Sequence, residues 1–222
     1  MISPVFVKTY DAPSYDEREI LRYIGETSPN SETVELVRSC IAEVEAHLSY
    51  KVCYAVYDAQ VTPDGVDMTF AKTKSTSLAK TLADSDRVIL VVASVGIGID
   101  RLVKKYLSIS ASRALVMQAI GAERVESLLD AFCIEMREKY RGLGQDITTR
   151  YSPGYGDLPI QLQREIFDTL DCSKRIGVSL SDSMMMTPTK SVSAIIGISR
   201  SICSDVSLDK CKNCNKDCQY RR

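Results

Sequence analysis

Four of the eight cysteines lie close together near the end of the chain. Cys211, Cys214 and Cys218 follow one another at CxxC and CxxxC spacing, and Cys203 lies within loop reach upstream. Four thiolates can complete a tetrahedral zinc site or hold a [4Fe–4S] cluster. The spacing occurs with both, so it predicts a metal site without choosing the metal. A reduced tail without metal is the alternative, and disulfides are disfavoured in a reducing compartment.

Two other features carry residue types found at functional sites. Gly96-Ile-Gly98 opens a helix after an apolar run, but it lacks the third glycine of the dinucleotide fingerprint and the Lys-Ser/Thr of a phosphate-binding loop. We therefore interpret it as a tight turn. His47 is the only histidine and falls on an amphipathic helix, so the sequence offers no histidine cluster for catalysis.

The elements that must position these residues follow from hydrophobic periodicity. Apolar spacing of three and four residues predicts helices, and runs of β-branched and aromatic residues predict strands. A capping box at Ser14 to Glu17 opens a first short helix. Further helices are predicted over 31–48, 75–83, 111–141 and 159–170, with a possible break at Gly121, and strands over 52–61, 66–70, 88–95, 175–180 and 191–199.

Helices and strands do not alternate as βαβ units, and Pro63-Asp64-Gly65 links two early strands as a hairpin. The fold class is therefore α+β: a single compact domain with a twisted, largely antiparallel sheet flanked by helices, plus a cysteine-rich C-terminal tail. Apolar periodicity stops near Arg200. We expect a domain over 1–200 and a metal-binding tail over 201–222.

The charge composition and the apolar runs indicate which kinds of binding partner and which cellular location to expect. Charged residues make up 26% of the chain and nearly cancel to a net charge of −1, so nothing favours nucleic acid or an anionic membrane. The N-terminus lacks a signal-peptide pattern and the longest apolar run is too short to span a bilayer. We expect a cytoplasmic protein, with the scattered cysteines as small core residues. These are Cys40, Cys53, Cys133 and Cys172.

Three segments, in order, resemble the S-adenosylmethionine-binding activation domain of cobalamin-dependent methionine synthase. They are Arg150-Tyr-Ser-Pro-Gly-Tyr155, the run from Arg175 to Pro188 with its Met184-Met-Met186, and Lys190-Ser-Val-Ser-Ala194. The helical segment Ala119 to Glu126, AIGAERVE, adds a weaker match. Without the resemblance, an arginine before a Pro-Gly turn would more often be a surface residue.

The resemblance implies an S-adenosylmethionine site. Arg150 would hold the methionyl carboxylate with its planar fork of donors, and Glu126 would lie near the amino group. The backbone of Ser152 would contact the adenine, and Gly154 would let the chain approach the ligand. Tyr155 would place its ring near the sulfonium. The three methionines could offer a soft surface to a corrinoid, but we expect them in the core.

The sequence also departs from the family pattern. A Tyr-Tyr pair that helps cover the ligand in the long form of the family is replaced by the cysteine tail. An acidic residue expected shortly before the motif has no clear counterpart among Gly144, Gln145 and Asp146. No Asp-x-His-x-x-Gly segment for binding cobalamin is present, so the corrinoid would come from another protein.

The function implied is the S-adenosylmethionine-dependent reductive reactivation, in trans, of the cob(II)alamin form of methionine synthase. The partners would be a cobalamin-binding methionine synthase or related corrinoid protein and a reducing electron donor. An electron relay favours an iron–sulfur cluster over zinc in the tail. The alternatives are a reactivator of another corrinoid methyltransferase and a zinc-stabilised interaction module without a small-molecule ligand. The sequence shows no acid–base cluster near the motif, and the resemblance implies none is needed.

Overall fold

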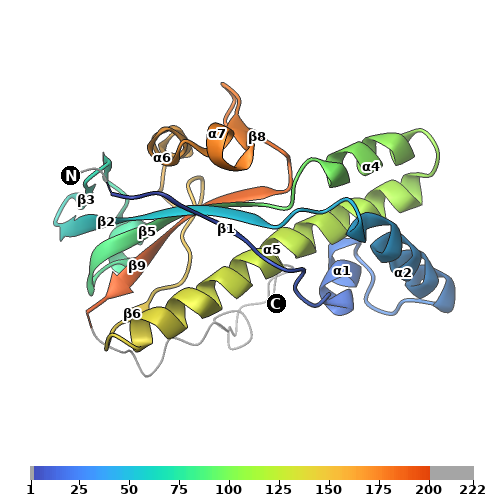
Figure 1. Cartoon of the computed structure of the whole chain (residues 1–222), viewed down its shortest axis with the longest axis horizontal. Coiled ribbons are helices and arrows are strands. Elements are labelled where there is room, and N and C mark those ends of the chain that lie inside the picture. The colour runs from blue at the N-terminus through green and yellow to red at the C-terminus, as the bar shows by residue number, and fades with distance from the viewer. Residues whose placement is uncertain (1–2, 201–222) are drawn as a thin grey trace.

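The computed structural model describes residues 3–200, in which helices cover both faces of an antiparallel sheet (Figure 1). The strand order is β4-β3-β2-β5-β9-β6, and β1 also pairs with β2. The strands are β1 (Phe6–Thr9), β2 (Lys51–Thr62), β3 (Gly65–Met68), β4 (Ala71–Thr73), β5 (Ser85–Ser94), β6 (Asp146–Ile147) and β9 (Ser191–Ser199). A separate hairpin joins β7 (Ser179–Leu180) and β8 (Met186–Thr187). The predicted α+β class is confirmed.

The helices divide between the two faces of the sheet. One hydrophobic cluster contains residues of α1 (Glu17–Tyr23), α2 (Ser31–Glu45), α4 (Gly98–Leu107) and α5 (Ala111–Arg141). The cluster on the other face contains residues of α3 (Thr76–Thr81), α6 (Leu162–Leu170) and α7 (Cys172–Ile176). In Figure 1, α6 and α7 lie above the sheet and α5 runs beneath it.

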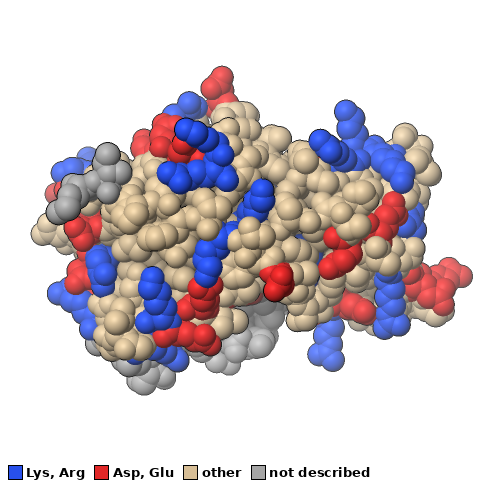
Figure 2. Space-filling view, in the orientation of Figure 1, with Lys and Arg blue, Asp and Glu red and all other residues tan. Residues whose placement is uncertain are grey.

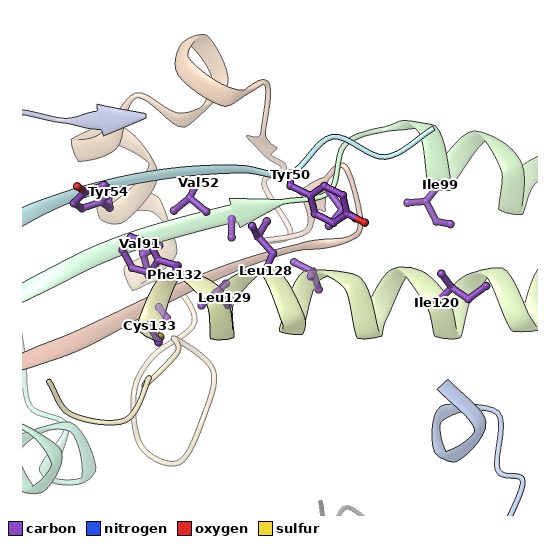
Figure 3. Packing of buried hydrophobic residues seen from close by; sticks show 14 of the residues in the cluster. Tyr50, Val52, Tyr54, Val91, Ile99, Ile120, Leu128, Leu129, Phe132 and Cys133 are labelled. Carbon is purple, nitrogen blue, oxygen red and sulfur yellow. The ribbon is translucent and has the colours of Figure 1, made fainter. Parts of the chain in front are cut away.

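The central strands are apolar on both sides because both faces are covered. In β5, Ile89 and Val91 belong to the cluster on the α5 face, whereas Leu90 and Val92 belong to the cluster on the α6 face. Figure 3 shows Val52, Tyr54 and Val91 of the sheet above Leu128, Leu129 and Phe132 of α5. A continuous apolar run in the sequence therefore marks a strand buried on both faces.

Most predicted elements are confirmed, with shifts at their ends. The long helix runs through Gly121 without a break, and the glycine leaves room for the side chain of Lys190: a Cβ there would lie 2.8 Å from the lysine Cγ. The first helix is capped by Asp16 rather than Ser14, because the Asp16 carboxylate accepts from two backbone amides of the first turn. The predicted hairpin is β2 and β3.

Two expectations are wrong. The segment 175–180 is not a strand throughout, since α7 continues to Ile176, Gly177 adopts a φ of +73°, and only Ser179–Leu180 is extended. The expectation of core methionines fails for Met184, which is only partly buried, and for Met185, which is 63% exposed, whereas Met186 is partly buried and packs against the cluster on the α6 face.

The four scattered cysteines are buried free thiols, as expected. Within residues 3–200, no helix is both long and apolar enough to cross a membrane. Cys203, Cys211, Cys214 and Cys218 lie outside the described residues, so the tail over 201–222 and its metal stay predictions.

Candidate functional site

A cleft of about 920 Å³ opens where α5, the segment after β6 and the edge of β9 meet. Its lining comes from α5 between Glu123 and Ile134, from the segment 148–155, and from residues 191–193 of β9. Gln163 of α6 and Met186 of β8 also contribute. The predicted motif at Arg150 therefore forms part of the wall of this cleft.

Backbone hydrogen bonds hold the segment 148–155 along the edge of the sheet. Tyr151 exchanges two hydrogen bonds with Ile195, of 2.9 and 2.8 Å, and the Thr148 amide donates to the Gly197 carbonyl at 2.9 Å. β6 is only two residues long and pairs with the last two residues of β9. The chain beyond it continues beside β9 without forming a regular strand, which leaves space for the cleft.

Gly154 makes the turn that follows. Its φ is +91°, a conformation that L side chains rarely adopt, and its amide donates to the Leu158 carbonyl at 2.9 Å. The Tyr155 amide donates to the Ser152 carbonyl at 3.2 Å. The conformation of the turn therefore requires a glycine at position 154. From the sequence alone, this glycine was explained only by the close approach of the chain to the ligand.

Arg150 lies between two carboxylates of α5. Its Nη2 is 2.8 Å from Glu126 Oε2 and its Nη1 is 2.7 Å from Asp130 Oδ1. Glu126 and Asp130 are four residues apart, so they share one face of the helix. A guanidinium beside two carboxylates can bind a group that carries both charges, namely the carboxylate and the ammonium of an amino acid.

The cleft is acidic, which corrects the expectation that no carboxylate cluster lies near the motif. Five acidic residues and one arginine line it. The five are Asp16, Glu19, Glu123, Glu126 and Asp130. Arg22 and Arg124 pair with Glu19 and Glu123, so three arginines in all lie beside the five carboxylates, and the remaining excess of two negative charges favours a cationic ligand. The sequence hid this cluster because α1, which carries Glu19, packs on α5 from a distant part of the chain.

Glu123 forms a buried ion pair with its neighbour Arg124, which occupies its carboxylate. The Arg124 Nε lies 2.6 Å from Glu123 Oε2, and both side chains are almost fully buried. Arg124 also donates to the backbone carbonyls of Pro13 and Ser14 and stacks over the Tyr15 ring at 3.7 Å. This pair therefore fastens the N-terminal segment to α5 and places α1 at the cleft.

Cys133 is the one thiol among the residues that line the cleft. Burial raises its pKa to about 11, so the thiol is neutral at physiological pH. A neutral, buried thiol is a poor nucleophile. Cys133 therefore serves as part of the wall.

The structure brings the predicted residues together. Glu126, Arg150, Ser152 and Tyr155 all line the cleft, and Gly154 forms the turn between the last two. Tyr155 is 70% exposed and lies at the rim. Asp130 was missed, although its spacing of four residues from Glu126 was a usable signal. Gln163 and Ser193 were also missed, since a glutamine in a helix and a serine in a strand give no local sign of a site.

Comparison with known proteins supplies a family. Residues 70–213 match the family model of the vitamin B12 dependent methionine synthase, activation domain, which is well over half of the chain. The crystal structure of the MetH reactivation domain bound to AdoHcy matches with a TM-score of 0.66 and 14% identity, covering 87% of this chain and 78% of that chain. At this identity the likeness shows a shared fold. A search of curated proteins finds no match.

Proposed function

This chain belongs to the vitamin B12 dependent methionine synthase activation domain family, and we propose that it binds S-adenosylmethionine in the cleft beside Arg150 to serve the reactivation of a cobalamin enzyme. The observation that carries the proposal is the Arg150, Glu126 and Asp130 cluster within one acidic cleft. The structural neighbour is bound to AdoHcy, the product left when S-adenosylmethionine gives up its methyl group, which supports the same class of ligand.

The amino-acid end of the ligand is assigned to the arginine cluster. When the ligand binds, Arg150 keeps one of its two carboxylate partners and binds the ligand carboxylate in place of the other. The carboxylate that Arg150 releases then binds the ligand ammonium. Glu126 is the partner assigned to the ammonium. Because each charge gains an opposite charge, the exchange leaves no charged group unpaired.

The adenosyl and sulfonium ends are assigned to the turn. The Ser152 backbone contacts the adenine, Gly154 sets the shape of the turn, and the Tyr155 ring lies near the sulfonium, where a cation and an aromatic face attract. The acidic lining adds a longer-range attraction for the sulfonium cation. Tyr155 at the rim is open to a partner on its other side.

In the proposed reaction, one electron and one methyl group are delivered to the Co(II) of a partner corrinoid. The electron comes from a reduced one-electron carrier and reduces Co(II) to Co(I). The S–CH₃ bond of S-adenosylmethionine then breaks as a Co–C bond forms, giving methyl-Co(III) and S-adenosylhomocysteine. This chain donates and accepts no proton in that sequence; it positions the methyl donor, an effect that can be large when the reacting atoms are aligned.

Binding is tested by calorimetry with S-adenosylmethionine and S-adenosylhomocysteine. Arg150→Lys keeps the charge but loses the fork, and we expect affinity to fall by about 10- to 100-fold, the usual effect of losing a hydrogen bond to a charged group. The matched control is Arg164→Lys, an exposed arginine outside the cleft, which should bind normally. No binding to the wild type at millimolar ligand contradicts the proposal.

The role in trans needs the partner. A Co(II) methionine synthase, mixed with this protein, a reductant and S-adenosylmethionine, should show conversion to methyl-Co(III) in its absorption spectrum. Equal rates without this protein, or with the Arg150→Lys variant at the same ligand concentration, would contradict the role. Another corrinoid methyltransferase in place of methionine synthase tests the choice of partner.

The metal site of the tail is a separate proposal, which rests on the sequence alone. Cys203, Cys211, Cys214 and Cys218 supply the four thiolates that a [4Fe–4S] cluster or zinc requires. Protein purified without oxygen should be brown, with iron and sulfide in cluster proportion, and Cys211→Ser or Cys214→Ser should remove the colour. Colourless protein with one zinc would leave only a structural metal.

A further inference from the structure

Two buried polar atoms in the wall of the cleft have no hydrogen-bond partner within residues 3–200. They are Oε1 of Gln163 and Oγ of Ser193. The two residues are 5% and 2% exposed. Buried polar atoms in folded proteins nearly always have a partner. The three other such atoms belong to Tyr50, Ser85 and Arg113, which do not line this cleft.

The edge of β9 adds backbone groups at the same place. Ile195 directs its N–H and C=O to Tyr151, and alternate residues of an antiparallel strand direct these groups to the same side. Ser193 therefore directs its N–H and C=O away from β5 and toward the cleft. β6 reaches only as far as Ile198, so within the described chain no strand pairs with β9 at Ser193.

Gln163 and Ser193 belong to the part of the cleft on the α6 side of the sheet, whereas the Arg150 cluster rests on α5. If the amino-acid group of the ligand binds on the α5 side of the cleft, its nucleoside can bind on the α6 side. We infer that Gln163 and Ser193 form the subsite that recognises the adenine base. This inference rests on the proposed function and deepens it.

The chemistry of the two side chains matches one edge of adenine. The base presents its exocyclic amine, a donor, next to a ring nitrogen that accepts. The Gln163 carboxamide accepts from the amine through Oε1, and the Ser193 hydroxyl can donate to the ring nitrogen. Hypoxanthine has a carbonyl in place of the amine, so with the Gln163 carboxamide oriented as in the structure it would set two acceptors against each other.

This subsite predicts a preference that can be measured. Wild-type protein should bind S-adenosylhomocysteine at least about tenfold more tightly than S-inosylhomocysteine, because a pocket built around a hydrogen bond rejects an analogue that leaves its polar group unpaired. Gln163→Leu should weaken S-adenosylhomocysteine by about tenfold and bring the two affinities close together. Ser193→Ala should weaken both ligands.

Thermal unfolding without ligand distinguishes a binding role of Gln163 from a purely structural one. Since Gln163 Oε1 has no partner in the described chain, Gln163→Leu should unfold at the same temperature as the wild type or higher, while losing affinity. The matched control is Gln161→Leu, at an exposed glutamine two residues earlier that does not line the cleft. It should keep both affinity and preference.

The outcomes separate the two proposals. If the wild type binds S-adenosylhomocysteine and Gln163→Leu keeps both the affinity and the preference for adenine, the subsite is wrong and the proposed function stands. A wild type that binds but does not distinguish the two bases also overturns the subsite. If the wild type binds neither ligand, the proposed function fails and the subsite fails with it.

Discussion

Single residues of the cleft are held in place by contacts to distant parts of the chain. Arg150 is fixed by carboxylates of α5, and Tyr151 is fixed by β9. Gly154 is different, because its own backbone conformation makes the turn that carries Ser152 and Tyr155. The position of two proposed ligand contacts therefore depends on one glycine.

Gly154→Ala should lower the free energy of unfolding by about 1–2 kcal/mol, the usual cost of a left-handed conformation for a residue with a Cβ. The new Cβ would lie 3.0 Å from Ile160 Cδ1, a side-chain end that can move, so backbone strain is the larger effect. Gly142→Ala is the control, since Gly142 has a φ of −60°. Urea unfolding measures both, and equal losses would contradict this account.

The sequence was informative about residues that form a contiguous motif and uninformative about those that meet only in the fold. Arg150, Ser152, Gly154 and Tyr155 could be predicted together because they are adjacent in the chain and resemble a family pattern. Gln163 and Ser193 could not, because only the packing of α6 against the sheet shows that their polar atoms are buried at the cleft.

At the scale of elements, one carboxylate ties the end of α5 to the start of β6. Asp146 lies 3.0 Å from Arg137 Nε and 2.9 Å from Arg141 Nη2, and it accepts from the Ile147 amide at 2.8 Å. Burial alone would raise the pKa of Asp146, but these hydrogen bonds hold it below the usual value. The connection from helix to sheet depends on the ionised form.

Asp146→Ala should cost about 3 kcal/mol or more, because it leaves the buried Arg137 without its carboxylate. The wild type should also lose stability in acid: a lowered pKa in the folded state stabilises above the unfolded value of about 4, and that contribution disappears as the pH falls through the folded value. Asp146→Asn should lose less on acidification.

Urea unfolding at several pH values measures both effects for Asp146. The control is Asp86→Ala, whose partner Arg87 lies 3.7 Å away at the surface, and which should change stability by less than about 0.5 kcal/mol. If Asp146→Asn has the same acid dependence as the wild type, this carboxylate does not carry the effect.

Helices and strands with strong periodicity were predicted well, whereas several short ones, among them β1 and α7, were not predicted. The bounds of α5 and β9 agree with the hydrophobic pattern. The error at 175–180 arose because Ile176 and Val178, two residues apart and both buried, look like one face of a strand. In the fold Gly177 ends a short helix between them. Tertiary packing decides such short segments.

At the scale of the whole molecule, positive and negative charges nearly balance, and the cleft is a local exception. Figure 2 shows acidic and basic side chains interspersed over one face, in agreement with the net charge of −1. The cleft, in contrast, has five acidic residues and one arginine in its wall. Attraction of the proposed cationic ligand would therefore come from the cleft and not from the net charge of the protein.

Because α1, α5, α6 and β9 all contribute to the cleft, ligand binding should stabilise the whole fold. At a ligand concentration of 100 times Kd, the gain is about 2.7 kcal/mol, which corresponds to a rise in Tm of roughly 5–10 °C for a chain of this size. Arg150→Lys at the same concentration should show a much smaller rise. A wild-type Tm that is independent of S-adenosylmethionine would contradict the prediction.

The overall fold and the motif in the wall of the cleft were within reach of sequence reasoning, whereas the rest of the wall was not. Periodicity and the hairpin turn indicate an antiparallel α+β domain, and the resemblance indicates which one. The buried pair of Glu123 and Arg124 holds the N-terminal segment, with its acidic residues, at the cleft. Two adjacent charged residues on a helix give no sign in the sequence that they are buried. The cysteine tail lies outside the described residues and stays a prediction.

Because β6 is short, one backbone amide of β9 can report whether the cleft is occupied. Ala194 directs its amide to β5, whereas the neighbouring Ser193 amide is directed to the cleft with no acceptor in the described chain. In deuterium exchange, the Ser193 amide should exchange much faster than the Ala194 amide, although both belong to β9. A bound base that covers this edge should slow Ser193 alone, so one backbone position would report occupancy of the cleft without any label on the ligand.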